Sequence, residues 1–143
     1  MKLRPFLAAL LLALVFYPLV RAEDGPTTDL EKEMKTMNKA FKQLKKQAGE
    51  AAQNASSLTL VALMEKAAVT SADLIPAKAA DLPEKDRAGF TASYKASMKE
   101  FTDALAKLEA AFKAGDNAAA AKLVADLNNL QRADHKKFRK PQD

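Results

Sequence analysis

Apolar side chains recur at spacings of three and four residues along four stretches of this 143-residue chain, and Gly or Pro residues separate the stretches. This spacing places the apolar residues of each stretch on one face of an α-helix. With only four Gly and six Pro, the chain lacks the frequent turn signals of a β fold. The pattern therefore predicts an all-α domain.

The first helix is predicted over residues 30–48. Thr28 and Glu31 have the spacing of a capping box at its start, and Gly49 follows its end. Acidic residues lie in its first turns and basic residues in its last ones, as the helix dipole favours. Its apolar face is a single row at helical spacing: Leu30, Met34, Met37, Phe41, Leu44 and Ala48.

Three more helices are predicted between residues that cap or break helices. Their expected bounds are Ser56 or Ser57 to just before Pro76, Pro83 to Gly115, and Asp116 or Asn117 through Phe138. Short connections make neighbouring helices run antiparallel, and the longest connection expected here is Pro76 to Pro83. We therefore expect an antiparallel up-down-up-down four-helix bundle.

Residues 1–22 have the pattern of a secretory signal peptide. Lys2 and Arg4 precede a short apolar run, Pro18 ends the run, and small residues stand at the −3 and −1 positions of a cleavage site after Ala22. A membrane anchor would need roughly 20 apolar residues, more than this run offers. We expect cleavage after Ala22, an exported domain over residues 23–143 without a membrane attachment, and a periplasmic location in a bacterium.

Charge and residue types exclude several classes of function. Residues 1–22 carry three basic and no acidic side chains, so the remainder has 20 Lys and Arg against 18 Asp and Glu, a net charge of +2. Such a small, mixed charge does not make a nucleic-acid-binding surface. The chain has no Cys and a single His, which excludes thiolate metal sites, covalent c-type haem and di-iron bundles. No Ser stands near that His in the sequence and a helical bundle offers no elbow to activate a nucleophile, so we do not expect an enzyme.

Two residues on the apolar faces are candidate metal ligands. His135 projects at the border of the apolar stripe of the fourth helix, and Met34 belongs to the stripe of the first. A half-exposed surface His and a core Met are the alternatives for each position. In an antiparallel bundle the start of the first helix adjoins the end of the fourth, so an imidazole and a thioether could approach opposite faces of a haem.

Both ends of the domain resemble the cytochrome b562 family of soluble periplasmic haem proteins. The resemblance rests on residues 28–38 (TDLEKEMKTMN) and on residues 131–139 (QRADHKKFR), and it is looser in the second helix. It implies that Met34 and His135 are the axial ligands of one non-covalently bound b-type haem per chain. Basic residues near the ligand His hold the haem propionates in the family. Arg139 matches a family arginine, Gln131 stands where another is expected, and Arg132 is displaced by one position.

The resemblance implies an electron carrier, because protein ligands fill both axial positions of the iron and a thioether raises its reduction potential. The alternative is a haem-free exported helical bundle that serves as an adaptor, a chaperone or a scavenger. A further hypothesis concerns five lysines that lie mostly opposite the apolar stripe of the first helix, where they could steer an acidic redox partner. They are Lys32, Lys35, Lys39, Lys42 and Lys46.

Overall fold

A computed structural model describes residues 28–141 of the chain, so the predicted signal peptide and its cleavage site lie outside the described residues. Within that range the chain is helical and contains no strand. Its elements are α1 (Asp29–Gln47), η1 (Ala51–Gln53), α2 (Asn54–Ala72), η2 (Ala77–Asp81), α3 (Glu84–Ala114) and α4 (Asn117–Phe138), η1 and η2 being short 3₁₀ helices. The predicted all-α class with four long helices is confirmed.

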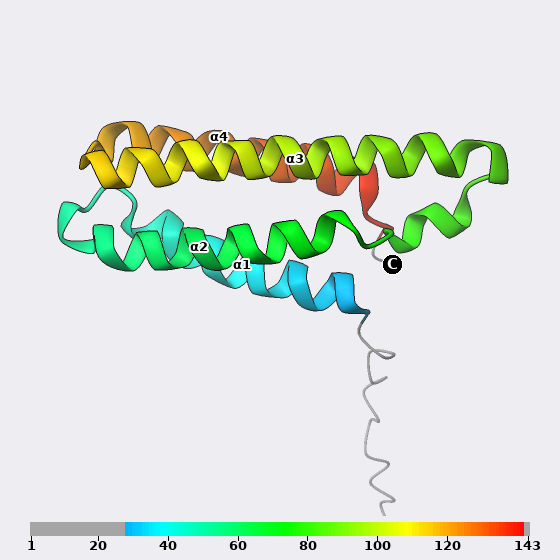
Figure 1. Ribbon diagram of the computed structural model, residues 1–143, viewed down its shortest axis with the longest axis horizontal. Coiled ribbons are helices and arrows are strands. Elements are labelled where there is room, and N and C mark those ends of the chain that lie inside the picture. Colours follow the sequence, from blue (N-terminus) through cyan, green and yellow to red (C-terminus); the bar gives the residue numbers. More distant parts are fainter. Residues whose placement is uncertain (1–27, 142–143) are drawn as a thin grey trace, which may run out of the picture.

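The helices lie in two layers, α1 with α2 and α3 with α4 (Figure 1). Each helix packs extensively against the next one along the chain, whereas α1 and α4 contact each other at only a few positions. The start of α1 and the end of α4 lie at the same end of the molecule (Figure 1). We call this the near end of the bundle and the opposite one the far end.

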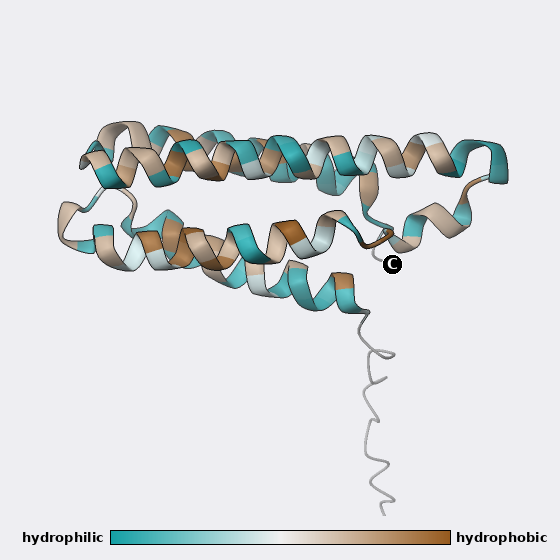
Figure 2. Ribbon diagram, viewed as in Figure 1, coloured by the Kyte–Doolittle hydropathy of each residue, from teal (hydrophilic) through white to brown (hydrophobic). Residues whose placement is uncertain are grey.

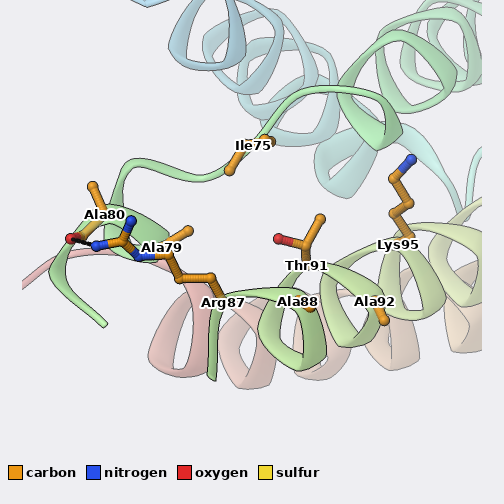
Figure 3. Close-up of a pocket in the computed structure, with 8 residues that line it drawn as sticks. All are labelled: Ile75, Ala79, Ala80, Arg87, Ala88, Thr91, Ala92 and Lys95. Atoms are coloured by element: carbon orange, nitrogen blue, oxygen red, sulfur yellow. Dashed lines mark hydrogen bonds between the residues drawn. The ribbon is translucent and has the colours of Figure 1, made fainter. Parts of the chain in front are cut away.

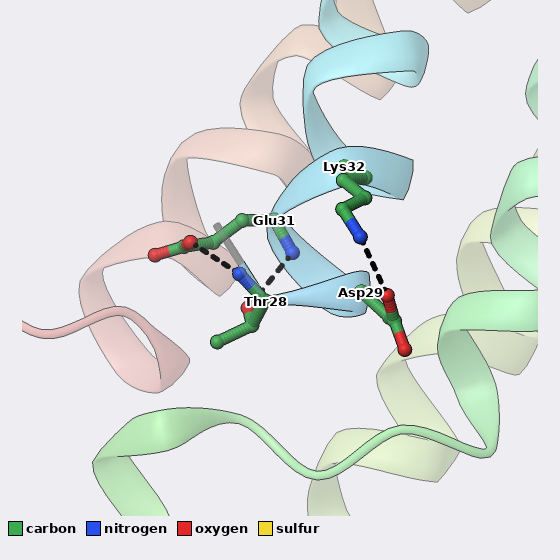
Figure 4. A network of polar contacts seen from close by, with 4 residues as sticks. All are labelled: Thr28, Asp29, Glu31 and Lys32. Atoms are coloured by element: carbon green, nitrogen blue, oxygen red, sulfur yellow. Dashed lines mark hydrogen bonds and ion pairs between the residues drawn. The ribbon is translucent and has the colours of Figure 1, made fainter. Parts of the chain in front are cut away.

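Side-chain caps begin the first and last helices as their sequences predict. The Thr28 hydroxyl accepts a hydrogen bond from the backbone N–H of Glu31, and the Glu31 carboxylate accepts one from the N–H of Thr28 (Figure 4). Two of the unpaired N–H groups at the start of α1 are thereby satisfied. Asp116 caps α4 by accepting from the N–H of Ala119 at 2.9 Å. Each such cap stabilises a helix by about 1 kcal/mol.

The start of α2 differs from the prediction. α2 begins at Asn54, directly after η1, and neither Ser56 nor Ser57 caps it. Both hydroxyls instead accept hydrogen bonds from the buried amide of Gln47, at 3.1 and 3.0 Å. A buried amide needs hydrogen-bond partners. The two serine hydroxyls therefore bind the Gln47 amide, and they do not cap α2 as the local capping rule predicts.

The predicted apolar faces form one core between the layers. Leu44, Leu105 and Leu127 are almost completely buried in it. The ribbons show apolar and polar positions alternating around α1, α3 and α4 (Figure 2). Gly115 ends α3 with φ of 72°, a left-handed conformation that Gly adopts without strain. No helix within residues 28–141 is both long and apolar enough to cross a membrane.

Tyr94 joins α3 to α2 at the near end. Its buried hydroxyl donates to the backbone carbonyl of Ser71, with an O···O distance of 2.9 Å. Burial, together with the nearby charge of Asp134, raises the pKa of Tyr94 from 10.0 to about 12. The folded chain therefore keeps the phenol proton at pH values where the unfolded chain loses it, so this group's contribution to stability is complete below pH 10 and is lost as the pH rises through 12.

This shift can be measured directly, because a chain expressed from Glu23 has Tyr94 as its only tyrosine and contains no Trp. We expect the tyrosinate absorbance of the folded chain to appear near pH 12, and that of the chain unfolded in urea near pH 10. Tyr94→Phe should lower the free energy of unfolding by about 1 kcal/mol at neutral pH, the usual value of one hydrogen bond. The variant should also lose part of the alkaline decline in stability. Coincident titrations of the folded and unfolded chains would contradict the interpretation.

Candidate functional site

The two predicted ligand residues belong to the start of α1 and the end of α4, which lie at the near end (Figure 1). Met34 lies in the second turn of α1, where it is partly buried and packs against the core. His135 lies in the last turn of α4, and its side chain is exposed. The two residues therefore stand on two helices, α1 and α4, that contact each other at only a few positions.

An aromatic cluster attaches the last turn of α4 to α3. The buried ring of Phe138 meets Phe90 and Tyr94 edge to face, with ring centroids 5.3 and 5.4 Å apart. Such pairs add about 0.5–1.5 kcal/mol each to the burial of the rings. Phe138 follows His135 by three residues and thus lies on a neighbouring part of the helix surface. The backbone that carries the imidazole is thereby held against α3.

Polar contacts hold the same turn against α3 and η2. The Lys137 ammonium donates to the Ser93 hydroxyl on α3. The Lys78 ammonium on η2 donates to the Lys137 carbonyl at 2.8 Å, which satisfies one of the unpaired carbonyls at the end of α4. Just beyond the helix, Lys140 forms an ion pair with Asp81 at 2.9 Å.

We call the contact between α1 and α4 the seam. Among the described residues, hydrogen bonds cross it only toward the far end. There the Lys45 ammonium lies 3.3 Å from the side-chain oxygen of Asn128, and the Asn117 amide donates to the carbonyl of Ala48 at 3.0 Å. In the near half of the seam, no hydrogen bond or ion pair joins the two helices among the described residues. Separating α1 from α4 in this half would therefore break no polar contact among the described residues.

The environment of His135 favours the form of imidazole that binds metals. Partial desolvation of the ring, and secondarily the positive charge of Arg139, lower the pKa of His135 below its ordinary value of 6.5, while Asp134 acts in the opposite direction. The neutral ring is the form that offers a nitrogen lone pair to a metal. No group of three or more His, Cys, Asp or Glu side chains that could hold a metal ion occurs in the described part of the chain.

Sequence reasoning did not anticipate a second feature of the near end, an open groove between α3 and the segment that leads from α2 through η2 (Figure 3). Its volume is about 670 Å³. It is lined by Ile75, Ala79, Ala80, Arg87, Ala88, Thr91, Ala92 and Lys95. Neither Met34 nor His135 lines it. Small side chains that the chain brings together from separate segments leave no pattern that could reveal such a groove in advance.

The chain was then compared with known proteins. Residues 29–139 match the cytochrome b562 family, which covers all four helices and both predicted ligand residues. A search among curated proteins found no match. The members of this family are haem-binding helical bundles that transfer electrons, and they are not enzymes. Because the match extends over most of the sequence, the chain belongs to the cytochrome b562 family.

Proposed function

We propose that the protein is an exported, periplasmic electron carrier, an antiparallel up-down-up-down bundle that holds one b-type haem non-covalently, with Met34 and His135 as the axial ligands. The observation that carries this proposal is the near half of the seam. One candidate ligand stands on each side of it, and no polar contact among the described residues closes it.

The side chains of Met34 and His135 are suitable ligands for haem iron. Met34 offers a thioether from a partly apolar site, and His135 offers a neutral imidazole at the surface. When bound, haem would supply an iron that changes between the ferrous and ferric states, and the thioether favours the ferrous one. With no Cys in the chain, binding is non-covalent. The contacts of Phe138 and Lys137 hold the turn that carries the imidazole, so the ligand is preorganised by α3 and η2.

Arg139 is the better candidate for the haem propionates. It stands at the end of α4, and its charge reaches the imidazole of His135, whose pKa it lowers. Arg132 is also exposed but shows no such effect on His135. A guanidinium forms strong paired hydrogen bonds with a carboxylate. We therefore assign Arg139, rather than Arg132, to this role.

Substitution of the two ligands tests the proposal. We expect wild-type protein reconstituted with haemin to show the bands of six-coordinate low-spin iron. His135→Ala should abolish stable binding or leave a high-spin remnant. Met34→Leu keeps the volume of the side chain and removes only the sulfur, so it should retain haem more weakly, lower the reduction potential and admit external ligands. Visible spectra and redox titration measure these effects.

Met37→Leu is the matched control, because Met37 is buried one turn further along α1. It should leave the spectrum and the potential unchanged. Unaltered spectra in His135→Ala or Met34→Leu would show that the ligand has been assigned to the wrong residue. A colourless wild-type protein that ignores added haemin would instead favour the alternative function, a haem-free adaptor, chaperone or scavenger.

Export is tested separately. We expect the protein recovered from the periplasm of an expressing bacterium to begin at Glu23, because cleavage follows Ala22 in the pattern Val-Arg-Ala. Amino-terminal sequencing or intact mass measures this directly, and Ala22→Asp should block processing. An unprocessed chain in the cytoplasm would contradict the periplasmic assignment without affecting the haem site.

The five lysines named above are all exposed along α1. We propose that this face attracts an acidic redox partner, since opposite charges accelerate association at low salt. Stopped-flow electron transfer to an acidic partner protein should slow as ionic strength rises. Changing Lys39 and Lys42 together to Gln should weaken that salt dependence. Lys113→Gln should not weaken it, because Lys113 belongs to α3 rather than to this face of α1. A rate indifferent to salt would rule out docking through these lysines.

A further inference from the structure

The groove at the near end has the volume of a small-molecule site but is open to solvent along its length. Its volume of about 670 Å³ lies within the roughly 300–1,000 Å³ typical of such sites. One continuous face of α3 forms its floor, and Ile75 lies across from Thr91 on the other side (Figure 3). The groove is independent of the candidate ligands Met34 and His135, which are not among its lining residues.

The lining is mostly apolar and includes no carboxylate. Ile75 is 66% exposed, the most exposed large hydrophobic side chain in the described part of the chain. Ala88 and Ala92, one turn apart on α3, are among the lining residues, and their side chains are too small to fill the groove. An aliphatic chain lying against these residues would remove apolar surface from water at Ile75 and at both alanines.

Arg87 supplies a fixed positive charge at one end of the groove. Its guanidinium donates to the carbonyl of Leu82 at 3.0 Å and to that of Ala80 at 3.2 Å (Figure 3 shows the second bond), which holds the side chain at the rim. These two bonds leave other guanidinium N–H groups for a ligand. Arg87 forms no ion pair with any carboxylate of the described residues. Lys95, about two turns further along α3, already lies 3.7 Å from Asp73.

We infer that the groove binds a free aliphatic carboxylate. The carboxylate group accepts paired hydrogen bonds from Arg87, and the hydrocarbon chain runs along Ala88 and Ala92 beneath Ile75. The assignment of the headgroup to Arg87 follows from charge complementarity, because the guanidinium is the cation of the groove that has no acidic partner among the described residues. This inference does not depend on haem binding.

Calorimetric titration of the purified protein with dodecanoate tests it. Arg87→Gln should weaken binding about tenfold, which corresponds to about 1.4 kcal/mol, and Arg139→Gln should leave it unchanged. Ala92→Phe should abolish binding by filling the groove. The matched control is Ala96→Phe, because Ala96 is also exposed, lies one turn further along α3 and does not line the groove.

Two further probes separate this site from the seam. Acetate lacks the hydrocarbon chain and dodecyltrimethylammonium lacks the carboxylate, so neither should bind with comparable affinity. Saturation with haemin should leave the affinity for dodecanoate unchanged. Absence of dodecanoate binding, equal losses in Ala92→Phe and Ala96→Phe, a loss in Arg139→Gln, or displacement by haemin would each overturn the inference. A failure of haemin to bind would contradict only the proposed function.

Discussion

The edge-to-face packing of Phe138 on Phe90 and Tyr94 decides where α4 ends. Without it, the last turn of an exposed, charged helix terminus would fray, because its carbonyls have no partners within the helix. With it, the turn follows α3, and Lys78 and Lys137 add polar contacts on the same side. Between α1 and the near half of α4, in contrast, no polar contact occurs among the described residues, and the candidate ligands Met34 and His135 stand on these two helices.

The two ends of the bundle differ in how completely their polar side chains are hydrogen-bonded. At the far end, polar side chains satisfy one another: the amides of Asn54 and Asn117 form reciprocal hydrogen bonds, and the amide of Gln47 serves two serines. Such networks specify one arrangement of helices. The near end lacks this completeness, since the buried hydroxyl of Ser71 has no partner among the described residues. A far end joined by this network, and a near half in which no polar contact joins α1 to α4 among the described residues, suit a bundle that admits a cofactor at one end.

Local rules predicted most of the helices because local physics forms them. The capping groups Thr28 and Asp116 act on backbone N–H groups three residues away, and the apolar rows on α1, α3 and α4 became the core. The same rules were wrong about Ser57. Its hydroxyl forms a buried hydrogen bond with Gln47, ten positions earlier in the chain, and does not cap α2. The candidate ligands were proposed from the sequence. The contacts that hold the last turn of α4 to α3 and η2 were not predicted, because they join residues 44 and 59 positions apart.

By itself, the sequence determined the helices and most of their buried faces, since periodicity and caps are local properties, and its resemblance to a family suggested Met34 and His135 as candidate ligands. Only the tertiary structure decided that the last turn of α4 is held by α3 and η2, and that Arg87 borders an apolar groove with its charge unpaired among the described residues. The reason is that packing depends on which distant side chains reach one another, and spacing along one helix carries no information about its neighbours.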